Sequence, residues 1–266
     1  MSERETTLLS HKERLRMFGA LFMNEFKKLT SRKRYTVFFL IGAALCLINL
    51  GIKMLVRLVA TGGAFENIFK TDLISLGMLS FFAEVLIPFI AFLAVSDIMA
   101  SEYQSGSIRA VLMRPVSRAK IYFSKVFAVF SLCIISFLGL YAVSAILDAA
   151  CGNMDGADFA YSLGIYIIDL IPVFIVVLMG AFINSMCRNS GMAMFICIAV
   201  YAVLKVGGIF MPSLSGLLFT GYTKWHTLWL GTTLPFNVML SKLMLIFGYA
   251  VVFASGGYYI FLKSDF

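Results

Sequence analysis

The chain has 266 residues, of which 61% are hydrophobic and only 14% charged, and its mean hydropathy is +0.92. An average soluble domain carries roughly 25% charged residues, so a soluble fold of this chain would expose much apolar surface to water. The composition therefore predicts an all-α, polytopic membrane protein. The five cysteines form no CxxC pair, and most lie in or beside apolar runs, which favours packing roles over a metal site or a disulfide framework.

The first 34 residues are polar and basic and lack an early apolar core, so we expect no cleavable secretory signal. A stripe of apolar residues recurs there at helical spacing: Leu15, Phe18, Phe22, Phe26 and Leu29. A basic amphipathic helix before a span is expected to lie flat on the inner leaflet, with its apolar face in lipid and its charges toward anionic headgroups. The alternative, a nucleic-acid-binding arm, is disfavoured because no nucleic-acid module accompanies the stripe.

Six apolar stretches are long enough to cross a bilayer as helices. They cover residues 35–52, 73–95, 121–147, 163–186, 192–210 and 236–262. The sequence thus predicts a single domain, in which a cytoplasmic tail and interfacial helix (1–34) precede a six-span membrane domain (35–266).

Lysine and arginine set the expected orientation. If both termini are cytoplasmic, the inner segments carry sixteen basic residues and the outer segments four. The outer turn after the third span has three aspartates and no base. The outer segment (residues 211–235) holds both tryptophans, Trp225 and Trp229, and is expected to form short helices that dip into the outer leaflet.

Recognised catalytic patterns are missing from the sequence. It contains no phosphate-binding loop, no HExxH zinc pattern and no GxSxG elbow, and its two histidines, His11 and His226, are far apart. Asp169 is the sole aspartate well inside a predicted span, which disfavours an intramembrane aspartyl protease. We therefore expect no covalent chemistry, no metal and no cofactor bound by this chain.

The segment between the second and third spans (residues 97–120) has helix signals at both ends. Asp97 to Ser105 can continue the second span as a helix, and Gly106 can end it in a left-handed conformation. Ser107 can begin a second short helix with Ile108 and Leu112 on one face. Pro115 ends that helix and Ser117 caps the third span. A rigid helical turn of this kind can transmit the movement of a partner protein to the spans.

The same residues carry a resemblance to a known family. Glu102-x-x-x-Gly106-Ser107-Ile108-Arg109, then Arg114-Pro115-Val116-Ser117-Arg118 and Lys125, resemble the first cytoplasmic loop of type-2 ABC transporter permeases, in particular the bacitracin and lantibiotic group. Ser107 replaces that family's usual threonine, and Val111-Leu112-Met113 replaces its leucine pair.

The resemblance implies the membrane subunit of an ATP-driven exporter in a bacterial-type plasma membrane. In that family the loop is the coupling helix that docks into a separate ATPase, which holds ATP and Mg²⁺. Two ATPase copies serve two permeases, either a homodimer or a pair with a paralogous permease. The implied coupling residues are Glu102, Gly106, Ser107, Ile108, Arg109 and Leu112. The alternative is that Glu102 and Arg109 are ordinary solvated charges.

Four charged residues fall inside predicted spans, where ionisable groups point to function by default. Glu84 lies near the centre of the second span, where the alternative is a protonated glutamate hydrogen-bonded to a neighbouring helix. Asp169, Lys205 and Lys242 share a depth of roughly 8 to 9 Å from the outer ends of their spans. They are expected to form a paired Asp–Lys layer, or, alternatively, the lysines simply extend to the interface.

Three function classes remain open: an ABC exporter permease, an ion-gradient-driven secondary transporter or flippase, and a membrane scaffold. A secondary transporter more often shows broken spans and an internal repeat, whereas here Pro88 and Pro172 are isolated. A scaffold would need neither Glu84 nor the stiff loop. The short outer turns favour an amphipathic peptide, a lipid or a drug as substrate.

Overall fold

The computed structural model describes residues 11–59, 73–106, 116–152, 154–211, 216, 218–223, 226 and 236–263. Over these residues the chain is helical and contains no strand, as expected of an all-α membrane protein. The elements are α2 (His11–Thr30), α3 (Lys33–Val59), α5 (Ile74–Phe81), the π-helical η1 (Phe82–Leu86), α6 (Ile87–Ile98), α7 (Ala100–Ser105), α9 (Arg118–Ala150), α10 (Gly156–Ile168), α11 (Leu170–Met186), α12 (Ser190–Phe210), the 3-10 helix η2 (Phe219–Tyr222) and α14 (Phe236–Lys263).

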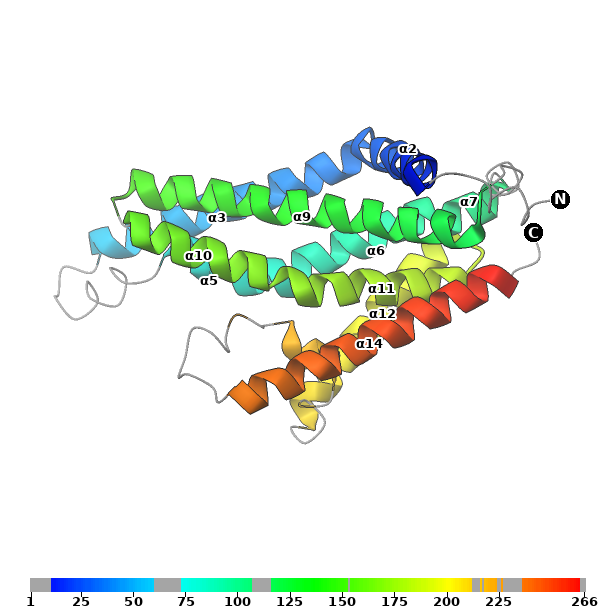
Figure 1. Cartoon of the computed structure of the whole chain (residues 1–266). Helices are drawn as coiled ribbons and strands as arrows, with labels where there is room; N and C mark the ends of the chain where they lie inside the picture. Colours follow the sequence, from blue (N-terminus) through cyan, green and yellow to red (C-terminus); the bar gives the residue numbers. More distant parts are fainter. Residues whose placement is uncertain are drawn as a thin grey trace.

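The six predicted spans are confirmed by six helical stretches of sufficient length and hydropathy. They are Lys33–Leu55, Ile74–Ser105, Arg118–Ala150, Gly156–Met186, Ser190–Phe210 and Asn237–Lys263. Helix α2, helix α7 and the C-terminal end of α14 lie at one end of the bundle, and the α9–α10 turn lies at the other (Figure 1). At the end that holds α2 and α7, Arg118 Nη1 donates to the Leu262 carbonyl at 2.7 Å. This hydrogen bond joins the start of α9 to the end of α14.

The second span is a composite helix whose irregular turn has a local cause. Pro88 has no N–H with which to bond the Glu84 carbonyl, and its ring disfavours regular α-helix at that turn. The Ile87 N–H instead bonds the Phe82 carbonyl, which is a π-helical bond. The Glu84 carbonyl therefore lacks the N–H donor that a residue other than proline would supply. The Tyr201 hydroxyl of α12 donates to it instead, at 3.0 Å.

The fourth span is longer than the sequence predicted. Its helix begins at Gly156 instead of 163, because Asp155 and Asp158 form a reciprocal capping box there. Asp169 interrupts the span between α10 and α11, with ψ of −8°. The predicted tight hairpin to the fifth span is present, and Asn189 caps α12 by accepting from the N–H groups of Gly191 and Met192 at 3.0 and 3.3 Å.

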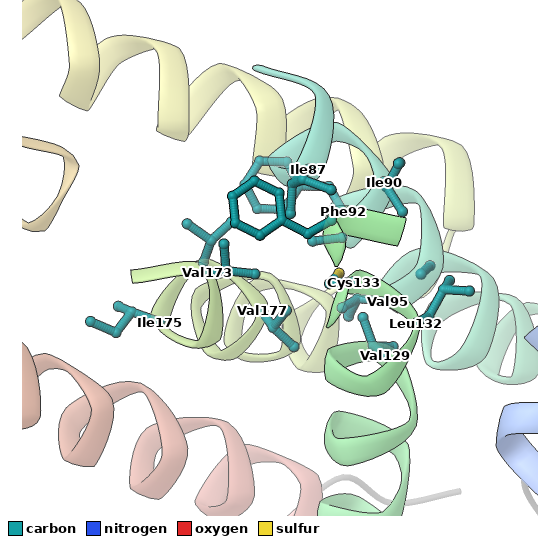
Figure 2. Packing of buried hydrophobic residues seen from close by; sticks show 14 of the residues in the cluster. Ile87, Ile90, Phe92, Val95, Val129, Leu132, Cys133, Val173, Ile175 and Val177 are labelled. Atoms are coloured by element: carbon teal, nitrogen blue, oxygen red, sulfur yellow. The ribbon is translucent and has the colours of Figure 1, made fainter. Parts of the chain in front are cut away.

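The centre of the bundle is built from α6, α9 and α11. Phe92 and Val95 of α6, Val129 and Cys133 of α9, and Val177 of α11 meet there (Figure 2). Helices α3, α12 and α14 surround this centre and expose many large apolar side chains. Such surfaces suit contact with lipid or with another membrane helix.

Helix α2 confirms the predicted amphipathic helix, but its apolar stripe does not face lipid as expected. Leu29 is buried, Phe22 and Phe26 pack against the core, and Phe18 meets Phe127 of α9 edge-on at 6.3 Å. The stripe is therefore used to dock α2 on the bundle. The sequence did not reveal this because lipid and a neighbouring apolar helix favour the same side chains.

Candidate functional site

Helix α7 continues the second span as helix, as the sequence predicted. It ends at Gly106, which adopts the left-handed conformation with φ of 70°. The next predicted coupling residues, Ser107, Ile108, Arg109 and Leu112, lie outside the described residues. Ser117 is the N-cap residue of α9, although its side chain makes no capping hydrogen bond.

Glu102 of α7 points into the protein and joins two other helices. Its Oε2 atom accepts from Lys125 Nζ of α9 at 2.8 Å, and its Oε1 atom accepts from Lys28 Nζ of α2 at 2.9 Å. Glu25 of α2 completes the group, 3.4 Å from Lys125. Glu102 is only 8% exposed, so the alternative that it is an ordinary solvated charge is wrong. We call Glu25, Lys28, Glu102 and Lys125 the α7 cluster.

Lys28 is the α7-cluster member that lies outside the spans. Partial burial acts to lower its pKa, but the hydrogen bond and charge of Glu102, followed by those of Glu25, outweigh burial. The net effect raises the pKa of Lys28 above its ordinary value of 10.5. Lys28 therefore carries a full positive charge at neutral pH.

Asp97, one turn before α7, ties the same end of the bundle to the start of the first span. Its carboxylate is 2.9 Å from Arg32 and 3.4 Å from Arg34, and it accepts a 2.9 Å hydrogen bond from the Tyr35 hydroxyl. Asp97 is 5% exposed. Together with the α7 cluster, it makes α2, α3, α7 and α9 one connected unit where the predicted coupling loop begins.

Glu84 pairs with Lys205, a partner that the sequence analysis did not suggest for it. Lys205 of α12 donates to Glu84 Oε1 at 2.6 Å, to Thr223 Oγ1 at 2.6 Å and to the Thr220 carbonyl at 3.1 Å. The predicted Asp169–Lys205 pairing is therefore wrong, and so is the alternative that Lys205 simply extends to the interface. The ammonium instead joins the π-helical turn to η2 of the outer segment.

Asp169 pairs with His226, a residue that the sequence did not single out as a partner. Its Oδ2 atom lies 2.6 Å from His226 Nδ1, and its Oδ1 atom accepts the His226 backbone N–H at 2.8 Å. His226 Nε2 lies 3.0 Å from Ser80 Oγ of α5. The predicted Asp169–Lys242 pairing is wrong as well, since Lys242 Nζ sits over the Tyr222 ring, 5.8 Å from its centroid.

The order serine–histidine–aspartate also occurs in acyl-transfer enzymes. Here Ser80 lies inside helix α5, where backbone N–H groups serve the helix ladder and cannot stabilise an oxyanion. His226 is 2% exposed and Asp169 is fully buried. The arrangement therefore serves as an anchor: it holds the outer segment on the bundle from a second side.

Asp148 is a further buried carboxylate that the sequence placed in an outer turn. It is fully buried at the end of α9, and its two oxygens accept the backbone N–H groups of Ile74 and Ser75 at 2.8 and 2.9 Å. The α9 residue thereby caps the N-terminus of α5. A carboxylate from a distant helix leaves no local capping pattern, so no sequence signal identified this role.

Six apolar helices long enough to cross a bilayer, joined by ion pairs between them, are the features of a multi-pass membrane protein. Comparison with known families agrees: a sequence model described as ABC-2 family transporter protein matches residues 21–207. The match covers well over half of the chain, which therefore belongs to the ABC-2 transporter family and is a type-2 ABC transporter permease. No curated protein matches the chain.

Proposed function

We propose that this permease forms half of the membrane pathway of an ATP-driven exporter and is coupled to a separate ATPase through residues 97–120. The observation that carries the proposal is the α7 cluster. Its ion pairs, of which Lys125–Glu102 is buried, fix the base of the loop whose sequence resembles a coupling helix. A solvated connecting loop would not need Glu102 and Lys125 buried together.

The α7 cluster supports a route for mechanical force. A partner that displaces the segment after Gly106 moves α7, and Glu102 transmits that displacement to α9 through Lys125 and to α2 through Lys28. Charge-assisted hydrogen bonds of 2.8 and 2.9 Å are stiff enough to move these helices together. Helix α9 reaches the opposite end of the bundle, so motion at the cytoplasmic end reaches the outer one.

The complete transporter under this proposal has two permease copies and two ATPase copies, with both permease termini in the cytoplasm. ATP and Mg²⁺ are bound in the ATPase. The second permease is an identical copy or a paralogue, and the exposed apolar faces of α3, α12 and α14 leave room for it beside lipid. The transported molecule is an amphipathic peptide, a lipid or a drug, as in the bacitracin and lantibiotic group.

The test is recovery of the cognate ATPase with tagged permease variants. Ile108→Asp and Leu112→Asp place charges in the predicted contact, and about 2.7 kcal/mol of lost docking energy would weaken binding roughly a hundredfold. Arg109→Glu is expected to act in the same direction. Gly106→Val acts through backbone strain, because φ is 70° and, apart from the chain neighbours, none of the described residues has an atom within 4 Å of an added Cβ.

Gly152→Val is the matched control for Gly106→Val. Gly152 has the same φ of 70° and the same open space around an added Cβ, but it lies in the α9–α10 turn at the opposite end. We expect loss of ATPase recovery for the loop variants and normal recovery for Gly152→Val, at equal membrane expression. Normal recovery and transport in all four loop variants would refute the coupling assignment.

A further inference from the structure

A cavity of about 320 Å³ lies between the last turn of α2 and the second span. It is open on one side and is lined by Lys28, Leu29, Arg32, Asp97, Ile98, Ser101, Glu102 and Ser105. This volume is at the small end of the range for ligand sites, so the cavity suits a headgroup rather than a whole lipid. We call it the α2–α7 cavity.

The α2–α7 cavity lies where two spans leave the apolar region. Arg32 directly precedes the first span, which begins at Lys33, and the second span ends at Ser105. Leu29 and Ile98, both nearly fully buried, supply apolar wall beneath the charged groups. A molecule in the cavity is therefore at the level of the lipid headgroups.

The lining is balanced in charge. Lys28 and Arg32 supply two positive charges, and Asp97 and Glu102 supply two negative ones. An anionic headgroup would meet both carboxylates as well as the bases. A zwitterionic headgroup can place each of its charges against the opposite sign.

Arg32 and the two carboxylates keep hydrogen-bonding capacity beyond the contacts they make within the described residues. Arg32 has five N–H donors and contacts Asp97, while each carboxylate offers about four acceptor positions. The three donors of Lys28 face both oxygens of Glu25 and Oε1 of Glu102, so Lys28 acts on a ligand through its charge. Glu102 accepts from two lysines, which leaves about half of its acceptor positions for a ligand.

We propose that the α2–α7 cavity binds the headgroup of a phosphatidylethanolamine-type lipid, with its phosphate on Lys28 and Arg32 and its primary ammonium on Asp97 and Glu102. The proposal does not depend on the ATPase. The ethanolamine ammonium donates three hydrogen bonds to carboxylates, whereas the trimethylated ammonium of phosphatidylcholine donates none. Discrimination between these two lipids is the signature of the site.

The experiment measures the binding of added lipids by native mass spectrometry. The full chain is first purified in detergent and stripped of its own lipids. The probes are dioleoyl phosphatidylethanolamine, dioleoyl phosphatidylcholine, dioleoyl phosphatidylglycerol and soluble O-phosphoethanolamine. We expect phosphatidylethanolamine to bind about tenfold more tightly than phosphatidylcholine, the equivalent of one or two hydrogen bonds. Tighter binding of phosphatidylglycerol would overturn the proposal, and equal binding of O-phosphoethanolamine would identify a site for a soluble zwitterion instead.

Ser101→Phe fills the cavity without removing a charge, and Ser255→Phe is its matched control. Both serines lie in helices, and each hydroxyl bonds the carbonyl four residues earlier, Asp97 for Ser101 and Val251 for Ser255. Ser255 is exposed on α14, away from the cavity lining. The preference for phosphatidylethanolamine should disappear in Ser101→Phe and persist in Ser255→Phe. If Ser101→Phe retains the preference for phosphatidylethanolamine over phosphatidylcholine, whether or not it still recovers the ATPase, the cavity is not a lipid site.

Discussion

Glu102 is the side chain at which α2, α7 and α9 meet, and its two lysines differ in burial. Lys125 is 1% exposed, whereas the Lys28 side chain is 44% exposed. A charge buried as deeply as Lys125 is costly unless its partner stays in place. The contact between α7 and α9 therefore depends on Glu102 more than the contact between α7 and α2 does.

Removing the charge of Glu102 should destabilise the protein strongly. Among the described residues, Glu102→Gln leaves Lys125 with Glu25, 3.4 Å away, as its remaining carboxylate and with the Ile98 carbonyl, and we expect a loss of about 3–5 kcal/mol. Lys125→Met should cost a similar amount, and the double variant clearly less than the sum of both. Reversible unfolding in mixed micelles measures these values.

The control is Arg34→Met. The Arg34 side chain is 62% exposed, so its replacement should cost less than about 1 kcal/mol of unfolding free energy. Equal losses in Glu102→Gln and the control would refute the role of the pair.

The raised pKa of Lys28 predicts an alkaline limit to the docking of α2. Because the folded protein holds this proton more tightly than the unfolded chain, the contribution is complete below 10.5 and is lost as pH rises through the raised pKa. The stability difference between wild type and Lys28→Met should therefore be constant from neutral pH to about pH 10 and shrink above it. A difference that already shrinks between pH 7 and about pH 9 would contradict this assignment.

At the scale of elements, polar contacts hold the described part of the outer segment on the bundle, and two of them use charged side chains of the spans. Lys205 ties η2 to the π-helical turn, and Asp169 ties His226 to the α10–α11 break. Both contacts use backbone irregularities of the spans. An irregular turn exposes polar groups that a regular helix would have used, and so provides attachment points inside the membrane region.

Breaking either contact should free the outer segment. Lys205→Met removes the ammonium that pairs with Glu84, and His226→Ala removes the ring partner of the fully buried Asp169 and leaves it the backbone N–H of residue 226. We expect amide hydrogen exchange at residues 218–226 to rise about tenfold or more, with the larger effect in His226→Ala. Lys242→Met is the control, because Lys242 contacts the same region through the face of the Tyr222 ring. If Lys242→Met increases exchange as much as the other two variants, the two contacts do not hold the segment.

The sequence did not predict the partners of the intramembrane charges. Counting residues along ideal helices placed Asp169, Lys205 and Lys242 in one layer, but it carried no information on the direction in which each side chain leaves its helix. Glu84 reaches Lys205 from a π-helical turn, whose altered pitch changes side-chain direction. His226 comes from a non-span segment, for which helical periodicity makes no prediction.

At the scale of the whole molecule, hydropathy predicted six spans because each must be apolar over about twenty residues. It did not predict which spans form the centre, since an apolar residue suits lipid and protein interior equally. In the second span, 67% of the apolar stretch is buried inside the protein, whereas in the sixth span only 6% is buried. Their mean hydropathies are nevertheless similar, 2.3 and 1.9. The same ambiguity hid the docking of α2 on α9.

The proposed orientation of the whole molecule can be tested with native cysteines. Cys151 and Cys187 are partly exposed at opposite ends of the fourth span, while Cys46, Cys133 and Cys197 are buried. With cytoplasmic termini, a membrane-impermeant maleimide should label Cys151 on intact cells and Cys187 only after permeabilisation. Burial raises the pKa of the Cys187 thiol above its ordinary value of 9.0, so its labelling should be slow at neutral pH and accelerate toward alkaline pH. Cys151→Ser and Cys187→Ser assign each signal, and labelling of Cys187 on intact cells would reverse the orientation and place the α7 cluster outside, where no ATPase could reach it.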